Sequence, residues 1–149
     1  DLECPARIKS YMDWERIQGL YDYSTYKDWA AKAKQTVNDL AIVIDAQRKA
    51  HNRLIVGYGA PAKGNTLLNF GNITLDFIID DNPLKQGKFC PGSNIPVVGI
   101  DRLNDYTSSK VAFVPLAWNF FTEIKRNIKT KRDKEGDVFI RYFPTISIE

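Results

Sequence analysis

The stretch RLIVGYGAPAKGNTLLN, residues 53–69, constrains the fold of this chain more than any other part. It opens with a short β-branched apolar run, passes through Gly57-Tyr58-Gly59 and continues with apolar residues at helical spacing. A strand, a glycine turn and a helix in this order aim backbone N–H groups at a phosphate. The stretch therefore predicts an anion-binding turn at the edge of an α/β sheet.

Short apolar strands and helices alternate through the rest of the chain. We expect strands at residues 53–56, 76–80, 96–98, 111–116 and 137–142. We expect helices at residues 62–70, 101–106 and 119–132, with Asn119 as the cap of the last. Such alternation implies a mostly parallel sheet covered on both faces. The predicted fold is a Rossmann-like α/β domain with a five-stranded sheet.

A long helix is expected before this sheet, over residues 26–51, with Thr25 and Asp28 forming a start that resembles a capping box. Its apolar residues recur at spacings of four, four, three and four, at Trp29, Ala33, Val37, Leu40 and Ile44. A further short helix is expected near residues 9–20, in an aromatic-rich segment. The predicted organisation is a leader or linker at residues 1–25 and a Rossmann-like domain at residues 26–149. The leader's aromatic side chains either form a contact surface or pack on the domain.

Composition limits the classes of partner. A net charge of +3 is too weak to indicate nucleic acid binding, and the basic stretch at residues 125–134 is typical of a solvated helix face. No apolar run is long enough for a membrane span. The chain has two cysteines, Cys4 and Cys90, and one histidine, which are too few to predict a metal site. Two widely separated cysteines are typical of reduced thiols, and no leader-like segment opens the chain, so we expect a cytoplasmic protein. The start at Asp1 suggests a piece of a longer protein.

Gly57-x-Gly59-x-x-Ala62 matches the dinucleotide-binding fingerprint with alanine in its third glycine position. In that pattern Gly57 permits a tight turn, Gly59 lets a pyrophosphate approach, and Ala62 lets the helix pack on the strand. Asp80 and Asp81 end the next predicted strand, where a carboxylate reaches ribose hydroxyls. The stretch GAPAKGNT is not a P-loop, because asparagine stands where the lysine is needed. A nucleotide site is predicted.

Several side chains near this turn have two interpretations. Lys63 either complements phosphate charge at the helix start or is an exposed helix lysine. Lys85 and Lys88 either close over phosphate or are solvated loop lysines. Trp118 either stacks on a base or sugar or packs over the end of the sheet.

Several blocks in order, GYGAPAKGNTLLNF, DFIIDDNPLKQGKFCPG, IPV and LAWNF, resemble the C-terminal domain of bacterial S-adenosylmethionine-dependent C-methyltransferases that act on nucleotide-linked deoxysugars or related substrates. The resemblance covers residues from Tyr26 to the end, and the leader matches nothing in that pattern. Enzymes of this family have a zinc-binding region, a methyl-donor domain and a Rossmann-like C-terminal domain. The tail YFPTISIE lacks the Pro-x-Pro ending of the family.

The resemblance implies that this domain binds a nucleotide-linked sugar against the methyl-donor domain. The positions it implies for substrate binding are Gly57, Tyr58, Gly59, Ala60, Pro61, Ala62, Lys63, Asn65, Thr66, Asp80, Asp81, Asn82, Lys85, Gln86, Trp118 and Asn119. It implies no catalytic residue and no metal ligand in this chain. S-adenosylmethionine would be bound by another domain of the full-length enzyme and no cofactor by this chain, so the chain alone is expected to be inactive.

Two other classes of function stay open from the sequence. The fingerprint also suits an NAD(P)-binding domain of an oxidoreductase or redox sensor, although Lys63 and the polar KGNT continuation argue against it. Alternatively, the long helix and aromatic leader belong to an interaction module in which the glycine turn is only part of the fold.

Overall fold

The computed structural model describes residues 5–149, which fall into two compact units. The first ends at Gln35 and the second covers Thr36–Glu149. The predicted boundary between a leader and a domain near residue 25 stays a prediction. Cys4 lies outside the described residues.

The first unit consists of α1 (Ala6–Ile17) and the first part of α2 (Tyr23–Lys49). No residue of α1 is buried, and the aromatic side chains of Tyr11, Trp14 and Tyr23 are exposed. The predicted capping box is wrong because α2 begins two residues before Thr25. The predicted apolar stripe is correct only in its later part, since Val37, Leu40 and Ile44 are buried but Trp29 is exposed.

The second unit is built on one six-stranded sheet with the order β3-β2-β1-β4-β5-β6. The strands are β1 (Leu54–Tyr58), β2 (Phe77–Ile79), β3 (Val97–Val98), β4 (Val111–Pro115), β5 (Val138–Arg141) and β6 (Ser147–Ile148). The first five pair in parallel, and β6 is antiparallel to β5. The predicted Rossmann-like α/β fold is confirmed. The sixth strand was missed because it joins one polar and one apolar residue, and so lacks the apolar run that predicted the equally short β3.

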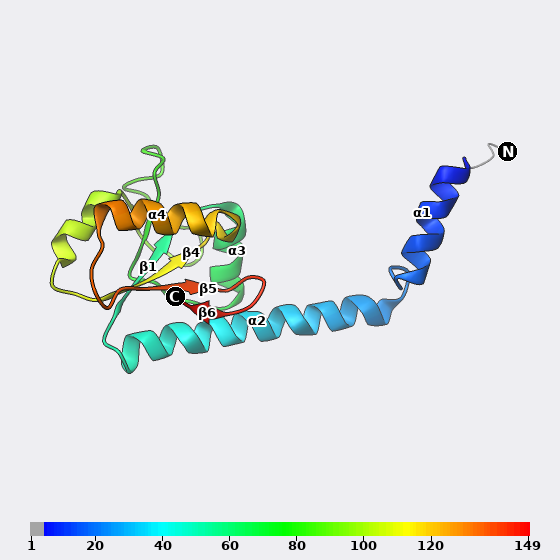
Figure 1. The fold of residues 1–149 in the computed structure, drawn as a ribbon, viewed down its shortest axis with the longest axis horizontal. Helices are drawn as coiled ribbons and strands as arrows, with labels where there is room; N and C mark the ends of the chain where they lie inside the picture. Colours follow the sequence, from blue (N-terminus) through cyan, green and yellow to red (C-terminus); the bar gives the residue numbers. More distant parts are fainter. Residues whose placement is uncertain (1–4) are drawn as a thin grey trace. The chain divides into compact units, whose positions relative to one another are not determined.

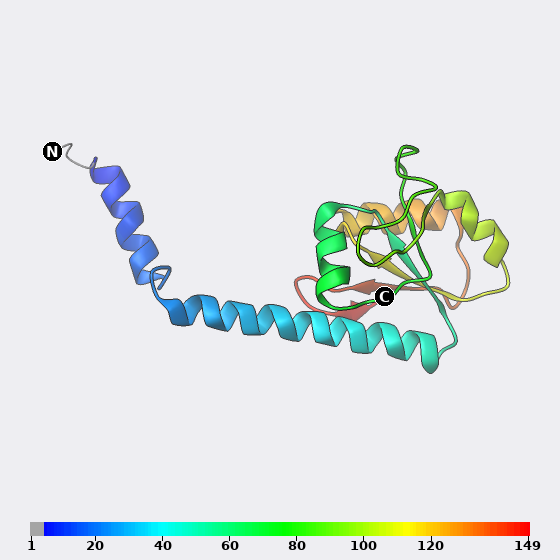
Figure 2. The same cartoon turned by 180° about the vertical axis from the view of Figure 1, so that it is seen from behind.

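Helices cover both faces of this sheet (Figures 1 and 2). The later part of α2 and α3 (Ala62–Phe70) pack on one face through Leu40, Ile44 and Leu68. The 3₁₀ helix η1 (Ile100–Tyr106) and α4 (Phe121–Lys131) pack on the other face through Leu103 and Ile128. Because the strands are buried on both faces, they contain continuous apolar runs rather than alternating apolar and polar residues.

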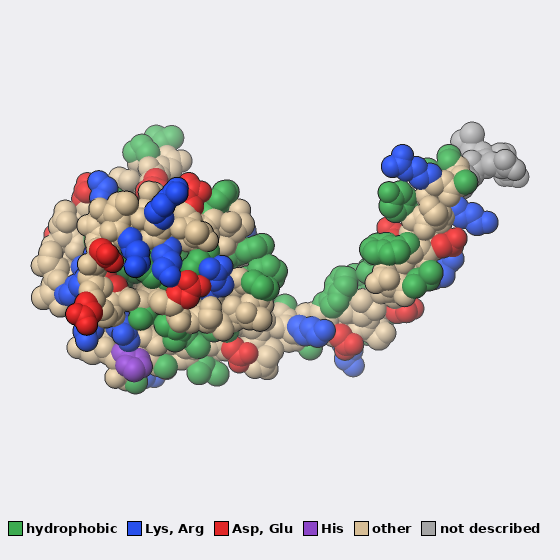
Figure 3. All heavy atoms as spheres, in the orientation of Figure 1, with side chains coloured by type: hydrophobic (Ala, Val, Ile, Leu, Met, Phe, Trp, Pro, Cys, Tyr) green, Lys and Arg blue, Asp and Glu red, His purple; other side chains and the backbone are tan. Residues whose placement is uncertain are grey.

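α4 follows a short 3₁₀ helix, η2 (Trp118–Phe120), so its N-cap is Phe120. The predicted role of Asn119 as the cap is therefore wrong, and no side chain caps this helix. Arg126, Lys129 and Lys131 of α4 are exposed. Basic side chains also gather on the face of the domain that Figure 3 shows. The predicted solvated face is correct for the three α4 side chains but wrong for Arg132, which lies in the same stretch and whose side chain is buried in an ion pair with Asp137. Within residues 5–149, no helix is long and apolar enough to cross a membrane.

Candidate functional site

Parallel pairing brings the carboxyl ends of three strands to one edge of the sheet. In the register of the sheet, Tyr58 at the end of β1 lies beside Ile79 of β2 on one side and Pro115 of β4 on the other. The residues that follow these strands therefore meet at this edge, where open parallel sheets bind their ligands. The turn after β1 and the acidic pair after β2 come together as the fingerprint predicts.

The glycines of the fingerprint have different roles from those predicted. Gly57 lies inside β1, where an added Cβ would lie 2.9 Å from Ile78 Cγ1 and 2.9 Å from Leu75 Cδ1, so it makes room for the core rather than for a turn. Gly59 makes the turn, with a φ of +82° that favours glycine. Ala62 is exposed, and the close contact between helix and strand belongs to Gly64, whose added Cβ would lie 2.8 Å from Leu116 Cβ.

Asp80 is the best-connected side chain at this edge. Its Oδ2 accepts hydrogen bonds from Ala60 N at 2.7 Å and from Lys85 Nζ at 3.0 Å, while its Oδ1 accepts one from Asn82 N at 2.9 Å. Burial by itself raises the pKa of Asp80, but the two backbone N–H donors and the Lys85 ammonium outweigh it and lower that pKa below the ordinary value. The carboxylate thus fixes the glycine turn to the loop after β2.

This arrangement predicts acid sensitivity. Because the pKa of Asp80 is lower in the folded chain than in the unfolded chain, its contribution to stability is complete above the unfolded-state pKa of about 3.9 and disappears as pH falls through the lower folded-state pKa. We expect Asp80→Asn to lower the free energy of unfolding at neutral pH by about 1–3 kcal/mol and to lose part of that acid dependence. Urea unfolding at a series of pH values measures both. Asp101→Asn, at an exposed aspartate, is the control, and equal losses in the two variants would contradict the prediction.

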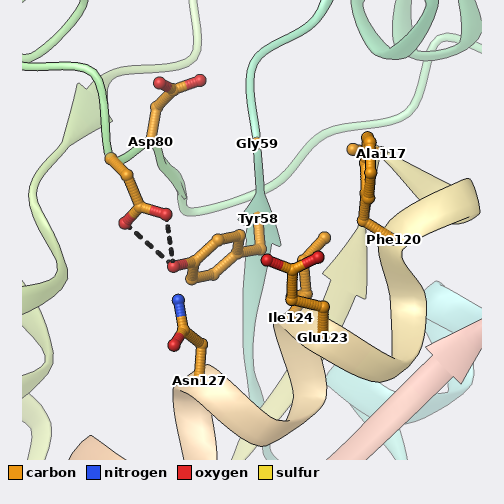
Figure 4. A pocket seen from close by; sticks show the side chains of 9 residues that line it. Tyr58, Gly59, Asp80, Ala117, Phe120, Glu123, Ile124 and Asn127 are labelled. Carbon is orange, nitrogen blue, oxygen red and sulfur yellow. Dashed lines mark hydrogen bonds between the residues drawn. The ribbon is translucent and has the colours of Figure 1, made fainter.

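The first of two cavities at this edge, here called the acidic cavity, has a volume of about 290 Å³. Its lining comes from the ends of β1 and β2 and from the segment 117–127, with the residues Tyr58, Gly59, Asp80, Asp81, Ala117, Phe120, Glu123, Ile124 and Asn127 (Figure 4). The Tyr58 hydroxyl lies 2.9 Å from both carboxylate oxygens of Asp81, and the Asn127 amide points toward it. Carboxylates, an amide and a phenol hydroxyl around one cavity suit a ligand rich in hydroxyl groups.

Tyr58 acts at this cavity as a hydrogen-bond donor. Burial of its ring, together with the neighbouring carboxylate of Asp81, raises its pKa to about 12. The phenol therefore keeps its proton at neutral pH and donates a hydrogen bond to Asp81. It does not supply a general base.

The second cavity, here called the lysine cavity, has a volume of about 350 Å³. It is lined by the first turn of α3 and by the loop after β2, with the residues Ala60, Pro61, Ala62, Asn65, Leu84, Lys85, Lys88, Phe89, Cys90, Pro91 and Val97. Lys85 is oriented by its hydrogen bonds to Asp80 and, at 3.0 Å, to Ala60 O. Cys90 is a buried, free thiol whose pKa is raised by burial.

Lys63, Trp118 and Asn119 form a separate group. Lys63 Nζ donates a hydrogen bond to Asn119 Oδ1 and lies 5.1 Å from the centroid of the Trp118 ring. The Trp118 ring packs at 4.2 Å from that of Phe143. These contacts join the start of α3 to the segment after β4, so both Lys63 and Trp118 have structural partners.

The remaining predicted residues line neither cavity. Thr66 Oγ1 donates to Ala62 O within α3, and the Asn82 side chain accepts from Leu84 N. Gln86 Nε2 donates to Asp80 O at 2.9 Å, and Gly57 is in the core. The sequence interpretation missed the contribution of α4, namely Glu123, Ile124 and Asn127. Their spacing of one, three and four positions on one helix face was the available signal, but it does not say which strand end the face meets.

Within the described part of the chain, no group of three or more His, Cys, Asp or Glu side chains is placed to hold a metal ion. The polar side chains at the strand ends bind one another and line the two cavities. The arrangement is suited to holding a polar ligand by hydrogen bonds and charge.

Comparison with known proteins agrees with this fold. A family model described as the C-methyltransferase C-terminal domain matches residues 3–144, and so includes most of the leader that the sequence resemblance did not cover. The chain is 30% identical over 142 residues to a protein named C-methyltransferase NovU from Streptomyces niveus, an alignment that covers 91% of this chain and 32% of that protein. The chain thus spans about a third of the length of this relative. Neither match points to an oxidoreductase. The chain belongs to the family of C-methyltransferase C-terminal domains.

Proposed function

We propose that this domain binds the nucleotide-linked sugar, or a similar small substrate, of an S-adenosylmethionine-dependent C-methyltransferase. In this proposal the domain holds the substrate against a methyl-donor domain outside these 149 residues. The zinc-binding and methyl-donor regions of the parent protein are its partners, and S-adenosylmethionine is bound by the latter.

The pair of cavities at the carboxyl ends of β1, β2 and β4 is the observation that carries the proposal. One cavity offers carboxylates to hydroxyl groups, and the other offers lysines to phosphate oxygens. A nucleotide-linked sugar has both kinds of group in one molecule. The two cavities lie at adjoining positions of the glycine turn, since one is lined by Gly59 and the other by Ala60.

The site favours binding over chemistry. C-methylation needs a base that removes a proton beside a carbonyl and a sulfonium methyl group placed in line with the resulting carbanion. Tyr58 keeps its proton at neutral pH, and Asp80 is occupied by three hydrogen bonds. We therefore assign the proton transfer and the methyl donor to the rest of the enzyme.

Isothermal titration calorimetry on the 149-residue chain tests the proposal. We expect binding of thymidine or uridine diphosphate sugars, weaker binding of NADH, and no methyl transfer from S-adenosylmethionine by the chain alone. Asp81→Asn is expected to weaken sugar-nucleotide binding about fivefold to tenfold, because the hydrogen bonds that a carboxylate accepts are stronger than those of an amide. The chain's fold is checked in each variant by circular dichroism.

Asp133→Asn, an exposed aspartate beyond the end of α4, is the matched control and is expected to bind like the original chain. Methyl transfer by the chain alone would refute the assignment of chemistry to other domains. Tighter binding of NADH than of every sugar nucleotide would favour the oxidoreductase alternative. Failure of a folded chain to bind any nucleotide would favour an interaction module.

A further inference from the structure

The two cavities beside the glycine turn carry opposite charges. Three carboxylates line the acidic cavity, those of Asp80, Asp81 and Glu123, and no lysine or arginine does. Lys85 and Lys88 line the other cavity, together with no aspartate or glutamate. A nucleotide-linked sugar concentrates its negative charge in one diphosphate, whereas its rings are uncharged at neutral pH. The two cavities therefore discriminate between parts of such a ligand.

We propose that the diphosphate of the substrate binds in the lysine cavity and that an uncharged, hydroxyl-bearing ring of the same molecule occupies the acidic cavity. This inference rests on the proposed function and assigns the two ends of the ligand to opposite sides of the turn at Gly59 and Ala60. The ribose and the sugar that is to be methylated share the chemistry that the acidic cavity recognises, because both are uncharged rings that bear hydroxyl groups.

The lysine cavity has positive charge to offer a ligand. The ammonium of Lys88 is exposed and makes no hydrogen bond or ion pair within residues 5–149. Lys85 uses two of its three N–H donors on Ala60 O and Asp80 Oδ2, which leaves one donor and holds the side chain in place. Lys85 thus contributes an oriented donor, and Lys88 contributes an uncompensated charge.

The start of α3, where Ala62 lines the same cavity, leaves backbone N–H groups without partners inside the helix. No side chain caps this helix, and Asn65 N donates back to Pro61 O at 3.0 Å, so the N–H groups before it are left for other partners, as at any helix start. Independently, Asn65 lines this cavity and its Oδ1 is a buried atom without a hydrogen-bond partner. Because that oxygen is shielded from solvent, the contribution of α3 to ligand binding is its backbone N–H groups.

The acidic cavity disfavours the diphosphate and suits a ring. A phosphate there would face three carboxylates with no cation in the lining. Glu123 is exposed at the cavity and makes no hydrogen bond or ion pair in the described part of the chain, so its oxygens are available to ligand hydroxyls. Ala117, Phe120 and Ile124 provide apolar surface for the face of a ring.

Titrations with separate parts of the ligand test the assignment on the 149-residue chain. The probes are inorganic diphosphate, uridine and thymidine diphosphates, the two nucleosides, and a methyl glycoside of a deoxysugar. Inorganic diphosphate is expected to shift the backbone amide resonances of residues 62–64 and 84–89 and to leave those of residues 123–127 unchanged. Whichever of the nucleosides or the glycoside shifts residues 123–127 identifies the ring in the acidic cavity.

Two variants separate the cavities. Lys88→Gln is expected to weaken inorganic diphosphate and nucleoside diphosphates by a common factor of about ten and to leave the uncharged probes unchanged. Glu123→Gln is expected to leave diphosphate binding unchanged or slightly tighter and to weaken the uncharged probe. Lys131→Gln, at an exposed lysine on α4, removes the same charge and is expected to change nothing.

Diphosphate shifts centred on residues 123–127 would overturn the inference, as would equal weakening by Lys88→Gln and Lys131→Gln. If sugar nucleotides bind the chain but Lys88→Gln leaves their affinity unchanged, the inference fails and the proposed function stands. If no probe and no sugar nucleotide binds a chain shown to be folded, the proposed function fails as well.

Discussion

Asp137→Ala is expected to lower the free energy of unfolding by about 3–5 kcal/mol, because it leaves an arginine charge buried without its partner. The side chains of Arg132 and Asp137 are only 8% and 6% exposed, and Arg132 Nε lies 2.6 Å from Asp137 Oδ2. The second carboxylate oxygen accepts a hydrogen bond from Val111 N at 2.8 Å, at the start of β4. The guanidinium also donates to Tyr106 O and Ser109 O. One substitution therefore disrupts contacts to β4 and to the end of η1.

Urea unfolding followed by circular dichroism measures this loss. Asp133→Ala is the matched control, since Asp133 pairs with Lys129 at 3.6 Å but its side chain is 75% exposed. We expect that control to change stability by less than about 1 kcal/mol. A loss at Asp137 no larger than that at Asp133 would show that the buried pair contributes little.

Phe113→Ala is the second substitution with a large expected effect, a loss of about 3–5 kcal/mol in the free energy of unfolding. Phe113 is fully buried in β4, and its ring stacks on that of Phe139 with centroids 5.2 Å apart. Removing the ring leaves a cavity between the sheet and α4, where Ile124 and Ile128 pack. The lost transfer free energy and the cavity add to each other.

The same unfolding measurement checks this prediction against Phe70→Ala. Phe70, at the end of α3, is 60% exposed, so its removal creates no buried cavity. We expect a loss below about 1 kcal/mol in the control. Phe113→Leu is expected to recover part of the stability, because it refills part of the volume. Similar losses for Phe113→Ala and Phe70→Ala would contradict the central place of β4 in the core.

The alternation of elements was predictable because it depends on local patterns. Short apolar runs bounded by glycine, proline and asparagine predicted the five parallel strands, and Pro61 and Gly71 marked the ends of α3. Where the sequence has no such apolar run, a strand of the sheet was missed. The edge strand β6 contains Ser147 and Ile148 and pairs with β5 at Ile140↔Ile148 and Arg141↔Ser147, so its strand conformation depends on that pairing rather than on an apolar run of its own.

The candidate site was only partly predictable. Because the carboxyl ends of parallel strands meet at one edge of a sheet, the sequence predicted that Tyr58, Gly59, Asp80 and Asp81 lie together, and these residues do line one cavity. Glu123 and Asn127 could not be assigned to it, because a helix face is visible in sequence but the strand end that it meets is not. Likewise, Gly57 and Gly64 were distinguishable only by the atoms that surround them in the folded chain.

By itself, the sequence determined the alternating α/β fold, the glycine turn with an acidic residue after the next strand, and the resemblance that the family match confirmed. These features are encoded over a few neighbouring residues at a time. Only the tertiary structure decided that Asp80 fixes the turn through Ala60 and Lys85, and that the polar groups there divide into two cavities of opposite charge. The physical reason is that charge and hydrogen bonding at a site depend on distances between side chains from different elements, which packing alone establishes.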